Sequence, residues 1–120
     1  MAAQIGNQLI PLLNAGAGSF TAQPALTVNA PSAVIAGNFH GPGGLPDIAA
    51  ASGNGNVLVF INQTASGASA TSFFTPAPIY PVGAQPVALA ASALTSDALP
   101  DLVTASNADS NLSVLLGQCP

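Results

Sequence analysis

The sequence predicts an all-β fold, and three observations lead to this prediction. Leu-Pro-Asp, followed by small and aliphatic residues and Ala-Ser, occurs at residues 45–52 and again, 54 residues later, at 99–106. The 12 glycines and 11 prolines interrupt the 120-residue chain every few positions. No stretch of ten residues keeps a helical apolar period with caps. Together these features predict an array of short strands joined by turns.

The first part of the chain contains three expected strands. Residues 7–14 form the first, and Pro11 within it predicts a sheet edge or a bulge, because proline cannot donate a ladder hydrogen bond. A Gly-rich turn then leads to an extended piece at residues 20–28. Residues 31–37 follow as a strand of small residues.

Three further strands are expected in the middle of the chain. Proline is tolerated at a strand entrance, so Leu-Pro-Asp at 45–47 reads as a turn feeding the strand that ends at Ser52. Residues 56–62 are apolar on both faces, which predicts a strand covered on both sides. Another extended piece is expected at residues 73–80.

The cycle then repeats. Residues 86–91 match 31–36, residues 101–106 form the second Leu-Pro-Asp strand, and residues 111–117 match both 56–62 and 7–13. These matches give nine strands with a period of four. Short turns favour antiparallel neighbours, and four-stranded units of roughly 40–50 residues are typical of β-propellers.

Several motifs also resemble a known family, the FG-GAP/VCBS-type repeats of β-propellers. Such repeats occur in integrin α-subunit heads, some fungal lectins and many secreted bacterial proteins. The matching segments are residues 14–20, 80–86, 86–91, 100–103 and 111–117. The resemblance implies four-stranded antiparallel blades and an extracellular or cell-surface location.

The chain divides into about two such blades. Residues 1–30 supply N-terminal strands that complete a blade, 31–80 form the first repeat, and 81–120 form a second, incomplete one. Closed propellers need about four to eight blades. The chain therefore assembles into a ring, stacks into an open fibre, or is an excerpt of a larger propeller. Because the sequence begins at Met1, we expect self-assembly.

The resemblance also implies a calcium loop of the form Asp-x-Asn-x-Asp-Gly-x-x-Asp, and here that loop is degenerate. The corresponding positions are Ala93, Thr95, Asp97 and Asp101 in the second repeat, and Asn38, His40 and Asp47 in the first. Calcium takes six to eight oxygen ligands, more than these side chains offer. We expect no cofactor. Calcium is the one candidate, with Asp97, Asp101, Asn38 and Asp47 as its ligands. We expect Asp47 and Asp101 instead to accept backbone N–H bonds, each in its own turn.

Composition excludes several functions. The chain has no Lys or Arg, and its formal net charge is −4, so it cannot neutralise nucleic-acid phosphates or anionic lipid. No apolar run approaches the roughly 18 residues that cross a bilayer. Four aspartates and one histidine leave few acid–base partners, so we expect no enzyme. The single cysteine, Cys119, excludes an intrachain disulfide and leaves a free thiol or an intermolecular bond.

The function predicted from these observations is a non-catalytic, extracellular structural protein that assembles with itself into a ring or filament by strand exchange. The expected assembly residues are Phe20, Val28, Leu112, Val114 and Leu116. The alternative is a carbohydrate-binding propeller module, with a glycan as partner, or an excerpt of a larger adhesion propeller. Few aromatic residues are available to stack on sugars, which favours the structural role.

Overall fold

The computed structural model describes residues 2–41, 45–63 and 74–118, and it describes side chains for 6–41, 45–63 and 79–118. Every regular element in these ranges is a β-strand, which confirms the all-β prediction. The strands are β1 (Ala2–Ile5), β2 (Gln8–Gly16), β3 (Ser19–Ala22), β4 (Leu26–Thr27), β5 (Pro31–Gly37), β6 (Asp47–Ser52), β7 (Asn56–Asn62), β8 (Phe74–Pro81), β9 (Pro86–Ser92), β10 (Asp101–Ser106) and β11 (Asn111–Leu115).

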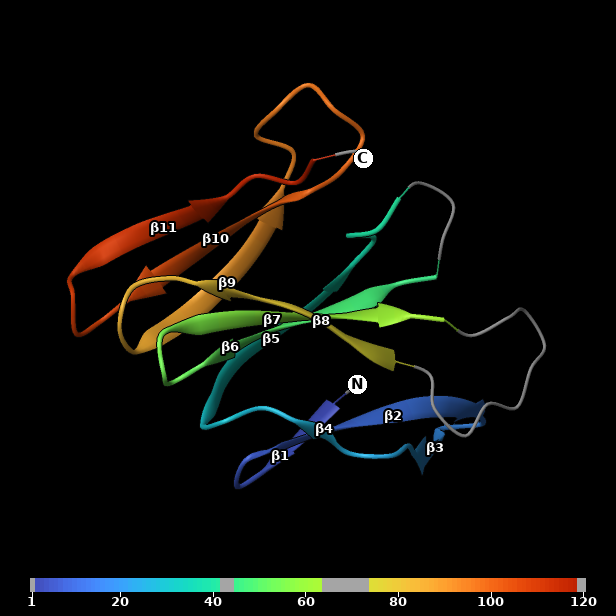
Figure 1. Cartoon of the computed structure of the whole chain (residues 1–120). Coiled ribbons are helices and arrows are strands. Elements are labelled where there is room, and N and C mark those ends of the chain that lie inside the picture. Colours follow the sequence, from blue (N-terminus) through green and yellow to red (C-terminus); the bar gives the residue numbers. More distant parts are fainter. Residues whose placement is uncertain (1, 42–44, 64–73, 119–120) are drawn as a thin grey trace.

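The strands form three antiparallel sheets, which lie one above another in Figure 1. In the N-terminal sheet, β2 pairs with β1 along one edge and with β3 and β4 along the other. The middle sheet is the meander β5-β6-β7-β8, and the C-terminal sheet is the meander β9-β10-β11. The described residues contain no helix that could span a membrane.

The N-terminal sheet differs from its prediction in three places. Strand β1 was not predicted, because Ala2–Ile5 lacks an apolar alternation, although the Gly6-Asn7 dipeptide that follows is typical of a hairpin turn. The extended piece at 20–28 is interrupted between β3 and β4. Strand β2 is central, so of the two alternatives that Pro11 predicted, a sheet edge or a bulge, the edge is wrong. Pro11 lies opposite the gap between β3 and β4, where no ladder bond is needed from its nitrogen.

The middle sheet is covered on both faces, as the apolar pattern of 56–62 predicted. One face carries Ala50 and Phe60, which form a buried cluster with Leu9 and Val28 of the N-terminal segment. The other face carries Val57 and Val59. They form a second cluster with Leu102 of the C-terminal sheet. The alternation of side chains along β6 and β7 therefore contributes residues to both of these clusters.

Backbone hydrogen bonds fix which residues of the sheets are equivalent. The N–H of Val28 donates to the carbonyl of Asn7 at 3.1 Å, and the N–H of Val82 donates to that of Gly55 at 2.9 Å. Residue 7 is thus equivalent to residue 55, and the predicted match of 7–13 with 56–62 is wrong by one position. The correct match is 8–14, and a shift of one residue exchanges the two faces of a strand.

With this correction, equivalent residues of the first two sheets make the same kind of contact with the next sheet. Leu9 of β2 and Val57 of β7 hold equivalent positions, and each faces the next sheet along the chain. They are 2% and 0% exposed. The equivalent residue in β11, which also follows the first paired position of its hairpin, is Leu112, and it is 70% exposed.

Candidate functional site

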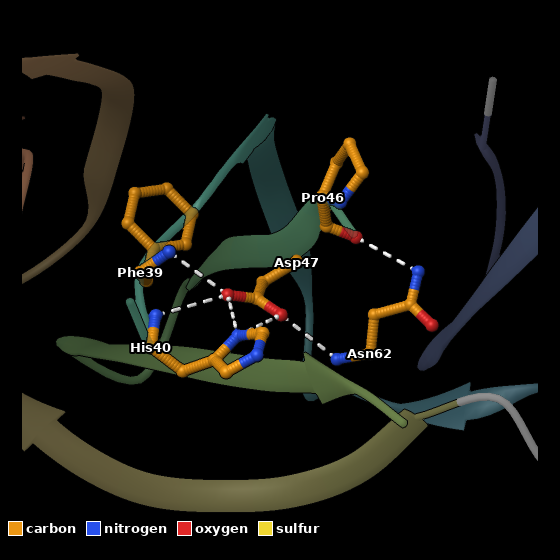
Figure 2. Close-up of polar contacts among 5 residues, drawn as sticks. All are labelled: Phe39, His40, Pro46, Asp47 and Asn62. Atoms are coloured by element: carbon orange, nitrogen blue, oxygen red, sulfur yellow. Dashed lines mark hydrogen bonds and ion pairs between the residues drawn. The ribbon is translucent and has the colours of Figure 1, made fainter. Parts of the chain in front are cut away.

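The first Leu-Pro-Asp motif places a carboxylate inside the middle sheet. Asp47 begins β6 and is fully buried. Its Oδ2 accepts hydrogen bonds from the backbone N–H groups of Phe39 at 2.8 Å and His40 at 3.2 Å. Its Oδ1 accepts one from the N–H of Asn62 at 2.8 Å, so Asp47 joins the loop after β5 to the end of β7 (Figure 2).

His40 completes this arrangement. Its Nδ1 lies 2.7 Å from Oδ2 of Asp47, and Figure 2 shows the ring folded back over the carboxylate. The ring itself is 36% exposed. The amide of Asn62 donates to the carbonyl of Pro46 at 3.0 Å, which also fixes the proline that precedes Asp47.

The second Leu-Pro-Asp motif repeats the arrangement without a histidine. Oδ2 of the buried Asp101 accepts from the N–H groups of Leu94 at 2.7 Å and Thr95 at 2.9 Å. Its Oδ1 accepts from the N–H of Gly117 at 2.8 Å. The expectation that both aspartates accept backbone N–H bonds in their own turns is therefore confirmed. Gly117 holds the place of Asn62.

The environment of Asp101 alters its acidity. Burial raises the pKa of its carboxyl group, whereas the hydrogen bonds from Gly117, Leu94 and Thr95 lower it. The balance leaves the pKa of Asp101 below its usual value of 3.8. The carboxylate is therefore the form that the loop stabilises.

These contacts do not fit a calcium site. Both carboxylate oxygens of Asp47 and Asp101 already accept N–H bonds, and hydrogen-bond donors surround them where oxygen ligands would be needed. Asp97 is exposed and accepts from the N–H of Leu99 at 3.2 Å, while Asn38 is half-buried. The described residues contain no group of three or more His, Cys, Asp or Glu side chains that could hold a metal ion.

The structure separates the expected assembly residues into two groups. Phe20 on β3 is 48% exposed, and Leu112, Val114 and Leu116 are 70%, 51% and 54% exposed. Val28 is different, because it is fully buried against the chain's own core. Its expected role as a contact to another copy is not compatible with this position. Cys119 lies outside the described residues.

Two outer faces result from the sheet register. On the C-terminal sheet, Val103 lies opposite both Val114 and Ala90, and Ala105 lies opposite both Leu112 and Ala88. These six residues alternate with Leu102 and Leu115, which pack against the middle sheet. We call them the C-terminal outer face.

On the N-terminal sheet, Phe20 lies opposite Asn14 and Ala22 lies opposite Leu12. We call this four-residue set the N-terminal outer face.

Sequence patterns alone did not identify one further feature, a cavity of about 340 Å3 between the middle and C-terminal sheets. The residues that line it include Val59, Ile61 and Tyr80 on one side and Leu102, Leu115 and Gly117 on the other. Residues so distant in sequence meet only through sheet packing, so no local pattern could have predicted it.

Comparison with known proteins adds no further identification: no family model, no curated protein and no solved structure matches this chain.

Proposed function

We propose that this chain is a non-catalytic structural protein that assembles head to tail with copies of itself. Each sheet acts as one blade of a β-propeller-type array. The C-terminal outer face of one copy packs on the N-terminal outer face of the next. An interface of this heterologous kind closes into a ring or continues as a filament. In line with the repeat family that the sequence resembles, the proposed location is extracellular.

The observation that carries this proposal is the repeated packing of the sheets. The face of β2 that carries Leu9 is covered by the middle sheet, and the equivalent face of β7 is covered by the C-terminal sheet. On β11 the same face carries Leu112 and Val114, which are 70% and 51% exposed. A contiguous apolar surface of this kind is typical of a protein interface.

The charge of the chain is consistent with this role. Its formal net charge is −4, and it has no Lys or Arg. Neither proposed outer face contains a charged residue, so stacking copies would not bury an unpaired charge. Hydrophobic burial then provides the main favourable free energy of association.

The test is to weaken the C-terminal outer face without changing its fold. Leu112→Thr and Val114→Thr keep a high strand propensity and remove apolar surface at exposed positions. Leu94→Thr is the matched control, because Leu94 is 55% exposed but lies in the loop between β9 and β10. Sedimentation should show smaller particles for the two face variants alone. Equal particle sizes for all three variants and wild type would reject the proposed interface.

A carbohydrate-binding role is the second candidate, and exposed aromatic rings favour it. Phe20 and Tyr80 are 48% and 39% exposed, and sugars stack on such rings. These two residues belong to different sheets, however, and do not form one platform within a sheet. A glycan array tests this role, and specific binding that is lost in Tyr80→Ala would favour it over the structural one.

A further inference from the structure

Within the part of the chain that the structure describes, no strand occupies the outer edge of β11, whereas a strand occupies the equivalent edge in both other sheets. In the middle sheet β7 pairs with β6 and β8, and in the N-terminal sheet β2 pairs with β1 and with β3 and β4. Among the described residues, β11 pairs with β10 alone. Its second edge therefore presents backbone N–H and carbonyl groups that can template another strand.

The two segments that fill this position elsewhere share one sequence pattern. Phe-Thr-x-x-Pro-x-x-x-Val occurs at residues 20–28 and again, 54 residues later, at 74–82. The pattern keeps the same register in both sheets. Phe20 lies opposite Asn14, and Phe74 lies opposite Asn62. Both copies of the pattern thus occupy the same position in their sheets, which chance similarity of sequence does not explain.

The cavity between the middle and C-terminal sheets lies where such a strand would place its phenylalanine. Gly117 is the equivalent of Asn62, since both donate an N–H bond to Oδ1 of the buried aspartate. A phenylalanine opposite Gly117 shares the face of Leu115, and both Gly117 and Leu115 line the cavity. At about 340 Å3 the cavity is large enough for an aromatic ring, since about 150 Å3 holds benzene.

We propose that the edge of β11 and this cavity form an acceptor site for an extended segment of another polypeptide with the pattern Phe-Thr-x-x-Pro-x-x-x-Val. The segment pairs antiparallel to β11 and places its phenylalanine in the cavity. Main-chain hydrogen bonds supply affinity and the aromatic pocket sets the register, as in other cases of β-strand addition. The inference rests on the proposed function only in requiring a second polypeptide.

A peptide of residues 19–31 provides the probe, because it contains the complete pattern. Fluorescence anisotropy should show saturable binding of the labelled peptide to the intact chain. The matched control peptide carries Phe20→Ser and leaves the cavity unfilled. Its Kd should therefore be at least about tenfold higher than that of the unchanged peptide. Equal binding of both peptides, or no saturable binding of either, would overturn the proposal.

Disulfide cross-linking tests the register in a Cys119→Ser background. By equivalence with the other two sheets, peptide residue Thr21 lies opposite Leu116 and peptide residue Leu26 lies opposite Leu112. Cysteines placed at the 21–116 and 26–112 pairs should cross-link, whereas 21–112 and 26–116 should not. Leu112 and Leu116 are exposed, so these substitutions preserve the core. Equal yields for all four pairs would contradict the proposed pairing.

The two proposals fail separately. Peptide binding by a chain that sediments as a monomer would reject head-to-tail stacking and keep the acceptor site. A large particle that binds no peptide would keep stacking and reject the acceptor site.

Discussion

The buried carboxylate of Asp47 offers the sharpest test of how the middle sheet is held together. Asp47→Ala removes the acceptor for the backbone N–H groups of Phe39, His40 and Asn62. Water can replace the bond to His40, which is exposed, but reaches the half-buried Phe39 and Asn62 less easily. Each buried donor that loses its acceptor costs about 1–3 kcal/mol.

With two such donors, we expect Asp47→Ala to lower the free energy of unfolding by about 3 kcal/mol. That is a large part of the roughly 5–15 kcal/mol available to a domain. The corresponding fall in Tm is about 10 °C for a chain of this size. Thermal melting followed by circular dichroism, together with urea unfolding, measures both quantities.

Asp97→Ala is the control for this experiment. Asp97 is also a loop carboxylate, but it is exposed and accepts a single bond from the N–H of Leu99. Its substitution should change the free energy of unfolding by no more than about 0.5 kcal/mol. Equal Tm values for Asp47→Ala and wild type, or an equal loss of stability in Asp97→Ala, would contradict this prediction.

Three further predictions concern pH, calcium and packing. Because the pKa of Asp101 is lower in the folded chain than its usual value, its stabilising effect is complete above pH 3.8 and is lost as the pH falls through the folded-state pKa. Asp101→Asn should therefore flatten the decline of Tm in acid, and an unchanged acid profile would contradict this. Melting with calcium and with a chelator should coincide, since the carboxylates of both turns already accept N–H bonds; a chelator-dependent fall in Tm would show that the loops bind the ion. Gly83→Ala should destabilise the chain, because its Cβ would lie 2.7 Å from Cβ of Ser106 and even closer to the side chain of Asn111; an unaltered Tm would show that this contact between the β8–β9 loop and the β10–β11 hairpin is loose.

Most of the strands, and the backbone hydrogen bonds to the two aspartates, could be predicted because their determinants are local. Leu-Pro-Asp marks the start of β6 and β10, and the apolar run at 56–62 indicated coverage on both faces. The interruption between β3 and β4 was not predicted, because a proline in a strand is compatible with two arrangements. The proline can lie at a sheet edge or bulge, or, as here, it can lie in a central strand opposite a gap in the neighbouring strand.

Features that depend on contacts between sheets could not be predicted. The predicted match of β2 with β7 was wrong by one residue, because Asn7 and Asn56 each begin a similar apolar run in the sequence. The hydrogen bond from the N–H of Val28 to the carbonyl of Asn7 shows instead that Asn7 is equivalent to Gly55. Val28 ends the extended piece expected at 20–28, and its local sequence does not distinguish a contact to the chain's own core from a contact to another copy. It is buried because the N-terminal sheet turns this face toward Ala50 and Phe60 of the middle sheet.

The central claim is that this chain presents two complementary outer faces to copies of itself, and the mass of the native particle in solution tests it most directly. Light scattering coupled to size exclusion, repeated over a range of protein concentrations, should give the mass of two or more chains of 11.6 kDa each. A particle of 11.6 kDa at every concentration would contradict head-to-tail assembly.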